Sequence, residues 1–349
     1  MPLQIRPFTA TTDADFAALT RVMNAAHSER PTTPQLVRER DERREPRVRH
    51  ERFAAELDGE VVGVAHWGHH SSLFHPRRLL VCASVMPAHQ GQGIGGRLFD
   101  FVMQAAEADV EPISLRAVCR EDRARSVRFL EDRGFEPEAR GFESVLDLTT
   151  FDASPFAGTE DRVIADGIRL ATLADARDEA TFERWLHGIY LVDVEASKDI
   201  PAPEPLTIEA YEHWRQHVHS SNFLADGMHV ALDGDQVVGV SMLFTATEPH
   251  MLNTGLTGVL RSHRRRGIAL ALKLRAAAFA RARGATHVRT HNDEPNRAML
   301  SINEAMGFEK QPAYLDFYRS IRPDEDEHLA RKAARADHNA NTTATTAAG

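Results

Sequence analysis

These 349 residues lack the sequence features of a membrane protein and of a disulfide-rich protein. No run of eighteen apolar residues occurs, so we expect no membrane-spanning segment and no membrane partner. Residues 1–6 lack the basic and apolar stretches of a signal peptide, which predicts a cytoplasmic protein. Cys82 and Cys119 are the two cysteines, and two cannot form a disulfide framework or a zinc site.

An excess of positive charge is absent as well. The formal net charge is −9 and the sequence pI is about 6.1. An acidic surface does not suit a general nucleic-acid binder, and by steering it favours a cationic substrate such as an amine. The arginine-rich stretch 38–49 is interleaved with acidic residues, which is typical of a solvated, salt-bridged helix face. No persuasive Ser-His-Asp or Cys-His arrangement is present, so we predict no nucleophilic side chain.

Histidines are numerous but do not form a metal motif. His213 and His217 have the i, i+4 spacing of metal ligands, but no Glu-x-x-His pattern accompanies them. We therefore predict no metal. His66, His69 and His70 lie on an expected strand of the first half and could face a pocket.

What the chain does contain is an internal repeat. Residues 57–64 (LDGEVVGV) return at 232–240 (LDGDQVVGV), and the glycine-rich segment 90–95 returns at 264–269. The pair Gly134-Phe135 later returns as Gly307-Phe308. Three blocks in one order, at nearly one spacing, indicate a duplication.

The duplication predicts two domains, each a mixed α/β (α+β) fold with a twisted mixed sheet flanked by helices. We expect an N-terminal domain at 1–150, a linker at 151–162 and a C-terminal domain at 163–320. Residues 321–349 begin heavily charged and end in small polar residues, so we expect a disordered tail. Alternating apolar residues around the Asp-Gly pairs at 58–59 and 233–234 predict β-hairpins, each followed by a strand that enters the glycine-rich segment.

That segment carries the most chemical information, because it joins a strand to an amphipathic helix. A helix N-terminus presents unpaired N–H groups and positive dipole, and glycines allow the backbone to approach an anion closely. We therefore predict a phosphate cradle. Gly91, Gly93 and Gly96 also satisfy the dinucleotide fingerprint of a nicotinamide oxidoreductase. The second copy, 264–269, keeps one glycine and fails that pattern, which argues against this function.

Both copies do satisfy Gln/Arg-x-x-Gly-x-Gly/Ala after a strand that ends in valine. This resembles the coenzyme A loop of the GNAT acetyltransferase superfamily, and the resemblance covers residues 3–148 and 166–318. The tandem layout is similar to that of mycothiol-synthase-like double GNAT proteins. The resemblance implies acetyl-CoA as cosubstrate, with its pyrophosphate on the loop amides and its pantetheine arm along the preceding strand.

Cofactor contacts are implied for both halves. Asn292 and Asn296 match asparagines that contact the pantetheine arm in the family, although a helix cap is the alternative interpretation. The full set of implied cofactor-binding residues is Val85, Gln90, Gly91, Gln92, Gly93, Ile94, Gly95, Gly96, Val259, Arg264, Arg265, Arg266, Gly267, Ile268, Ala269, Asn292 and Asn296.

The catalytic residues are left unassigned. The family's usual tyrosine, its general acid, is replaced by Leu130 in the first half and Asn303 in the second, and Arg123 stands where the first asparagine is expected. No general base stands out either. Glu248 and Tyr314 are further candidates to border the second pocket.

The leading hypothesis is therefore an N-acetyltransferase in which the primary amine of a small molecule attacks the thioester directly within a ternary complex. Its asparagines make the second domain the preferred catalytic one. The alternative is a non-catalytic acyl-CoA-binding protein in which one or both domains are degenerate, because the tyrosine is missing from both. The acceptor's identity and the oligomeric state stay open.

Overall fold

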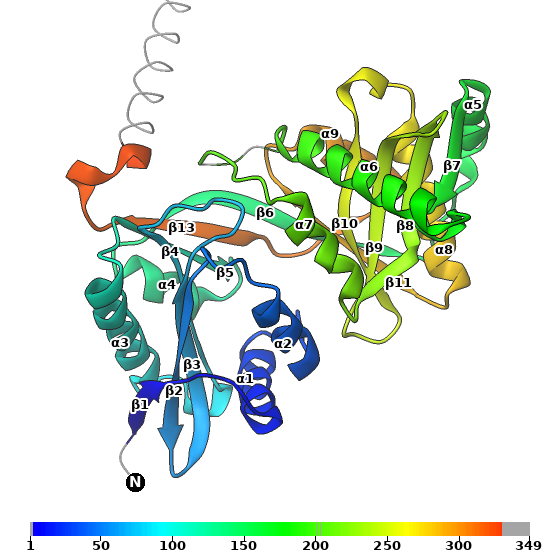
Figure 1. Ribbon diagram of the computed structural model, residues 1–349. Coiled ribbons are helices and arrows are strands. Elements are labelled where there is room, and N and C mark those ends of the chain that lie inside the picture. The colour runs from blue at the N-terminus through cyan, green and yellow to red at the C-terminus, as the bar shows by residue number, and fades with distance from the viewer. Residues whose placement is uncertain (1–2, 201, 203, 330–349) are drawn as a thin grey trace, which may run out of the picture.

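The computed structural model describes residues 3–200, 202 and 204–329. Within them, thirteen strands form one mixed sheet that runs through both halves of the chain (Figure 1). The strand order is β1-β2-β3-β4-β5-β13-β6-β11-β10-β9-β8-β7, and β12 pairs with β6. The expected mixed α/β fold, with a twisted mixed sheet and two similar halves, is confirmed.

The first half follows the expected order of elements. Its elements are β1 (Gln4–Pro7), α1 (Asp13–Ala26), α2 (Pro34–Glu42), β2 (His50–Leu57), β3 (Glu60–Gly68), β4 (Arg78–Val85), η1 (Pro87–His89), α3 (Ile94–Asp109), β5 (Ser114–Arg120), α4 (Ala124–Glu131) and β6 (Glu136–Asp147).

The second half repeats this order, preceded by two short helical segments, η2 (Ser154–Phe156) and α5 (Thr159–Ala165), which fall within or begin within the predicted linker. Its further elements are β7 (Ile168–Thr172), η3 (Leu173–Asp175), α6 (Glu179–Ser197), α7 (Tyr211–Trp214), η4 (Arg215–His219), β8 (Phe223–Asp233), β9 (Gln236–Thr245), β10 (Met251–Val259), η5 (Arg261–His263), α8 (Ile268–Ala282), β11 (His287–Asp293), α9 (Arg297–Met306), β12 (Glu309–Lys310), β13 (Tyr314–Ser320) and η6 (Pro323–Glu325).

Helices cover both faces of the sheet. In the first half, Phe53 and Ala55 of β2 pack in the core under α3, whereas Ala54 between them packs under α1 and α2. This is the two-residue periodicity of a strand that is buried on both sides. No helix of the described part is long and apolar enough to cross a bilayer.

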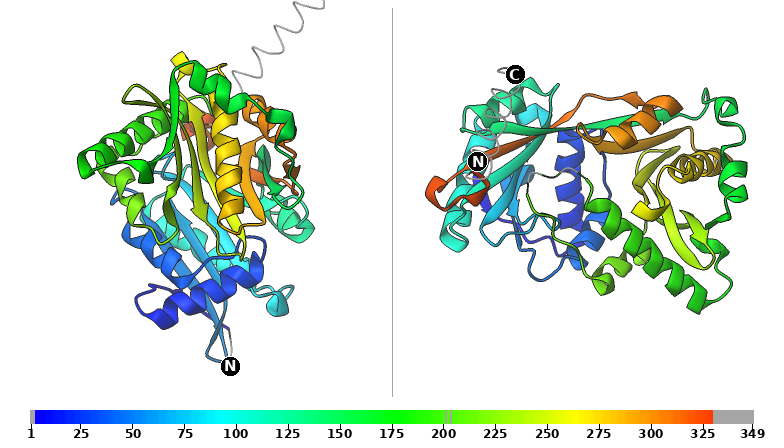
Figure 2. Two further views of the ribbon diagram at one scale, coloured as in Figure 1. Left: turned by 90° about the vertical axis from the view of Figure 1, so that its right-hand side faces the viewer. Right: turned by 90° about the horizontal axis from the view of Figure 1, so that it is seen from above.

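The two halves exchange strands where they meet. Strand β13, from the end of the second half, inserts between β5 and β6 of the first and pairs with β5 along its whole length. In return, residues 141–147 of β6 pair with β11 of the second half. Figure 2 shows these two strands running between the halves. Each half therefore obtains the strand beside its β5 or β11 from the other half.

A buried ionic contact adds to this connection. Glu204, from the segment between α6 and α7, is 7% exposed and lies against β4 and β5 of the first half. Its carboxylate accepts hydrogen bonds from Arg78 Nη1 at 3.0 Å and Arg116 Nη2 at 2.9 Å. Arg116 also pairs with Glu138 at 2.7 Å. This ionic contact, like the exchanged strands, thus crosses between the halves.

The prediction that a disordered tail begins at residue 321 is corrected for residues 321–329. Asp326 and His328 are 2% and 5% exposed. Tyr318 donates a hydrogen bond to Asp326, and His328 Nε2 lies 2.5 Å from a carboxylate oxygen of Glu138. Asp326 and His328 are therefore paired inside the protein and not solvated. The rest of the predicted tail, 330–349, lies outside the described residues.

Candidate active site

A cleft opens in the first half where β4 and β5 separate. These parallel strands are in register over three residue pairs, from Arg78 with Ser114 to Leu80 with Arg116. Beyond these pairs they diverge around a cavity of about 620 Å³. Most of the predicted residues of the first loop line it: Val85, Gln90, Gly91, Gly93, Gly95 and Gly96.

The glycine loop at one end of this cavity has the backbone of an anion cradle. Gly91 and Gly93 have φ angles of 79° and 80°, which side chains rarely tolerate. Gly93 is the N-cap of α3 and provides no side-chain cap, so the first amides of the helix are free to meet an anion. Gln90 Nε2 donates a hydrogen bond to the carbonyl of Val85 at 3.0 Å, which ties the loop to the end of β4.

The second loop has the same conformation despite its different residues. Gly267, the N-cap of α8, has φ 80°, and Arg265 has φ 63° at the position of Gly91. Arg264 Nε donates to the carbonyl of Val259 at 3.0 Å, as Gln90 does to Val85. A left-handed arginine is strained, so the backbone shape is retained at some cost in stability. The shared pattern therefore specifies a loop shape in both halves.

Two arginines that the sequence did not identify lie beside the first loop. The guanidinium of Arg125 lies 3.6 Å from the place where a Cβ on Gly91 would be, and that of Arg133 lies 3.2 Å from the equivalent place on Gly96. Arg133 also stacks on Phe129, 3.6 Å from the ring centroid. Both line the cavity and add positive charge where a phosphate would bind. For Arg133, the sequence signal was its place immediately before Gly134.

The arginines of the second loop have other partners. Arg264 forms an ion pair with Asp199 at 2.6 Å, and Arg266 forms one with Asp166 at 3.5 Å. Hydrogen bonds from Arg261 and Arg264 lower the pKa of Asp199 to about 2, so this carboxylate stays charged. The charges of Arg264 and Arg266 are therefore balanced locally.

The predicted asparagine ligands also have partners within the protein. Asn296 is the N-cap of α9 and accepts a hydrogen bond from the Met299 amide at 3.3 Å. Asn292 accepts one from the buried Asn303 at 2.7 Å. The helix-cap interpretation thus describes Asn296 in this structure, and cofactor contact by either asparagine stays a prediction.

His27 and Ser84 form a polar pair in the wall of the first cavity. His27 follows α1, and its Nε2 lies 2.9 Å from the hydroxyl of Ser84 on β4. Burial lowers the pKa of His27 below its ordinary 6.5, so the ring is neutral at pH 7. A neutral imidazole can accept a proton. Sequence reasoning missed His27 because it lies 57 residues before its partner.

Tyr314 lines the same cavity, although it belongs to the second half. The prediction that it borders the second pocket is therefore corrected, and the cause is the strand exchange that places β13 beside β5. The Arg30 guanidinium lies 5.3 Å from the ring centroid of Tyr314. Burial, followed by the charge of Glu143, raises the pKa of Tyr314 to about 12.

The histidines of β3 and the following loop have structural contacts instead. His69 accepts a hydrogen bond from the Arg49 amide, and its Nε2 lies 3.0 Å from the carbonyl of Pro76. The rings of His66 and His50 lie 4.9 Å apart. None of His66, His69 and His70 lines the 620 Å³ cavity.

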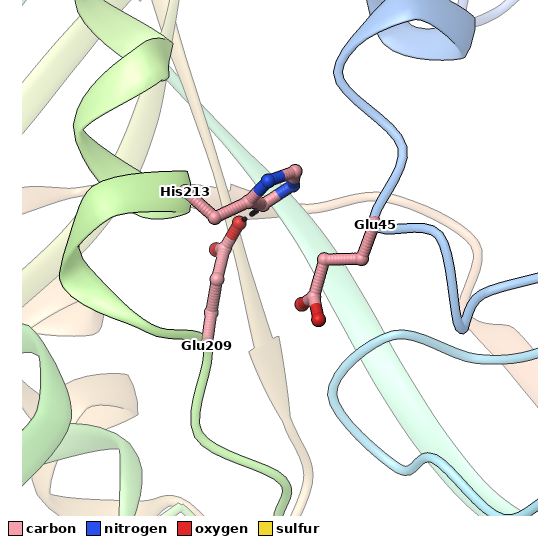
Figure 3. A group of neighbouring side chains, drawn as sticks. All are labelled: Glu45, Glu209 and His213. Atoms are coloured by element: carbon pink, nitrogen blue, oxygen red, sulfur yellow. Dashed lines mark ion pairs between the residues drawn. The ribbon is translucent and has the colours of Figure 1, made fainter.

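One cluster in the described part has the composition of a metal site. Ligand atoms of Glu45, Glu209 and His213 lie within 4.8 Å of one another, where the two halves meet (Figure 3). His213 pairs with Glu209 at 3.3 Å and Arg47 pairs with Glu45 at 2.6 Å. The ring of His217, the other residue of the spaced pair, stacks on Trp214 at 6.3 Å. Ion pairs account for this cluster, and we assign it no metal.

The loop, the diverging strands and the duplication agree with comparisons to known proteins. The sequence profile of the acetyltransferase (GNAT) family matches residues 17–135 and 185–308, together more than half of the chain. The chain belongs to the GNAT family. It is an N-acetyltransferase of this family with two tandem GNAT domains.

Its relatives share the tandem layout or the family chemistry. A mycothiol acetyltransferase of Thermobispora bispora is 28% identical over 233 residues, which cover 64% of this chain and 70% of that protein. A tandem GNAT protein from the clavulanic acid biosynthesis pathway superposes with a TM-score of 0.70 at 18% identity, covering 91% of this chain and 98% of the other. A GCN5-related N-acetyltransferase from Sphaerobacter thermophilus gives a TM-score of 0.64 at 19% identity, covering 92% and 96%.

Proposed function

We propose that the first half transfers the acetyl group of acetyl-CoA to the primary amine of a small molecule, by direct attack within a ternary complex. One observation carries this proposal. A single cavity joins the free amides at the start of α3 to the His27–Ser84 pair. An anion cradle and a proton acceptor in one cleft are what a phosphorylated acyl donor and an amine require.

The residues present fit coenzyme A. The loop amides of residues 90–96, with Arg125 and Arg133, would hold the pyrophosphate. The edge of β4 that is left open where β5 diverges, ending at Val85, would pair with the pantetheine arm. Acetyl-CoA supplies the activated acyl group, and backbone amides of β4 would stabilise charge on the thioester oxygen.

His27 would accept the proton that the amine loses. As the C–N bond forms, the amine nitrogen becomes cationic, and a neutral imidazole within the cleft can take its proton. The C–S bond then breaks and the sulfur leaves as a thiolate. Because the amine attacks directly, no nucleophilic side chain is needed, which agrees with the absence of a Ser-His-Asp or Cys-His arrangement in the sequence.

The acceptor's class is supported by two observations. The net charge of −9 attracts a cationic acceptor. The relative named mycothiol acetyltransferase supports a small molecule over a protein. A cytoplasmic location stays a prediction of the sequence.

Steady-state release of coenzyme A across a panel of small primary amines tests the function, and calorimetry with acetyl-CoA tests binding. We expect turnover with at least one amine, and loss of this turnover in Gly93→Glu, which places a carboxylate on the cradle. Gly267→Glu, the same change in the second loop, is the matched control. Tight binding of acetyl-CoA without turnover on any amine would support the alternative, an acyl-CoA binder. If the protein does not bind acetyl-CoA, both the proposed function and the alternative are wrong.

A further inference from the structure

We infer that Tyr314, which the second half supplies on β13, donates the proton to the coenzyme A thiolate in the cleft of the first half. This inference rests on the proposed function. It makes the first active site a composite of both halves of the chain.

The reaction needs such a donor because the sulfur leaves with a negative charge. A thiol of this kind has a pKa near ~8.5, so protonation at neutral pH assists its departure. Leu130, which stands at the family's usual acid position, is buried and apolar and has no proton to give. Ser84 is engaged by His27. Cys119 also lines the cavity, and burial raises the pKa of its thiol to about 11, so it is a second protonated group there, and the variant Tyr314→Phe tells the two apart.

The surroundings of Tyr314 suit a proton donor. Tyr314 lines the cavity, and its hydroxyl makes no hydrogen bond to any residue within the described ranges. With a pKa of about 12, the phenol is protonated at neutral pH. The charge of Glu29 acts on both Tyr314 and His27, so the donor and the acceptor lie near one carboxylate. In the proposed step the phenol proton moves to sulfur as the C–S bond breaks, and solvent restores it.

The duplication provides an internal comparison. Gly141 precedes Tyr314 by the same spacing that separates Gly134 from Gly307, so the two residues are counterparts in the repeat. Gly141 lies beside β11, opposite Asp293, as Tyr314 lies beside β5, opposite Arg120. A Cβ on Gly141 would lie 2.7 Å from His291 Nε2, so no side chain fits there without movement. The second half therefore lacks a phenol at this position, and we place catalysis in the first half.

The test is Tyr314→Phe in the full chain, which keeps the ring and its contact with Arg30 and removes only the hydroxyl. We expect kcat to fall by about 100-fold or more, the usual contribution of a positioned acid. The KM for acetyl-CoA and the melting temperature should stay at the wild-type values. Tyr211→Phe, which removes a hydroxyl that donates to Glu183 in the second half, should leave all three unchanged.

The outcomes separate the two proposals. An active wild-type enzyme whose Tyr314→Phe variant keeps kcat within about threefold overturns the inference and leaves the proposed function standing. A fall in kcat that comes with a raised KM and a lower melting temperature indicates a structural role and also overturns it. A wild-type protein that binds acetyl-CoA but turns over no amine overturns the proposed function and this inference together.

Discussion

Tyr314 lies directly opposite Gly141 in the antiparallel pairing of β13 with β6. The two residues are counterparts in the repeat, so the point where the halves exchange strands is also the point where they differ most in chemistry. The first half receives a phenol beside its β5, and the second half receives a glycine beside its β11. A duplication can retain the fold of both copies while one copy keeps the catalytic groups, because strand pairing depends on the backbone and catalysis on the side chains.

The strand exchange predicts that the chain unfolds as one unit. Separating the halves would expose the edges of β5, β6, β11 and β13 together, so neither half should be stable while the other is unfolded. Urea denaturation followed by tryptophan fluorescence and by far-UV circular dichroism should give coincident single transitions. Two separated transitions would show that each half folds alone and that the exchanged strands add little.

Replacing His27 should remove the proton acceptor. We expect His27→Gln to lower kcat by about 100-fold, with the melting temperature little changed. Because burial lowers the pKa of His27, the wild-type ring stays neutral below pH 6.5, and kcat should fall only at still lower pH. This acid limb should disappear from the residual activity of the variant. His219→Gln, an exposed histidine of η4, is the control, and an unchanged limb in His27→Gln would assign the proton acceptor elsewhere.

Arg133 offers a test of the phosphate site that the duplication itself suggests. Met306 stands at the equivalent position of the second half, directly before Gly307, so Arg133→Met copies that half into the first. Loss of a charge-assisted contact should raise the KM for acetyl-CoA by roughly 10-fold to 100-fold and make it less sensitive to salt, with kcat nearly unchanged. The control is Arg128→Met on α4, because the Arg128 side chain is 82% exposed. Equal KM values for the two variants would place the phosphates away from Arg133.

The loop could be predicted from the sequence because its determinants are local. Glycines at 91 and 93 report positive φ directly, and the strand before them and the helix after them follow from short-range periodicity. Arg265 shows the limit of that reasoning, since it adopts the same conformation without being glycine. The second copy was recognised through the repeat as a whole.

The composite site could not be predicted, because a strand's sequence shows its buried face but not its neighbour. Tyr314 was assigned to the pocket of its own half for this reason. His27, Arg125 and Arg133 were missed because their relation to the loop exists only after folding. The packed residues 321–329 were misjudged because charge was taken as solvated, whereas Asp326 and His328 find partners on β13 and β6.

Glu204 should be among the residues on which stability depends most. Glu204→Gln removes the negative charge that Arg78 and Arg116 share in a buried place. Breaking such a pair commonly costs about 3–5 kcal/mol, and the neighbouring Glu138 should reduce this to about 2–3 kcal/mol. Urea denaturation at pH 7 measures the change. Glu212→Gln, whose side chain is 82% exposed, should cost less than ~0.5 kcal/mol, and equal effects of the two changes would deny Glu204 this role.

His229 should make the protein sensitive to acid. It is 2% exposed on β8, its ring centroid lies 5.5 Å from that of Phe279, and neither ring nitrogen has a hydrogen-bond partner in the described part of the chain. Burial lowers its pKa to about 4, whereas the unfolded chain takes up the proton near pH 6.5. Between these values the unfolded state binds more protons than the folded state. The contribution of His229 to the free energy of unfolding is therefore constant above pH 6.5, and the free energy falls by roughly 3 kcal/mol as the pH drops towards 4. His229→Leu should remove this part of the pH dependence, so the difference in unfolding free energy between variant and wild type should grow in the variant's favour from pH 7 to pH 4.5. If this difference in unfolding free energy stays constant over the range, the His229 ring is protonated as readily in the folded protein as in the unfolded chain.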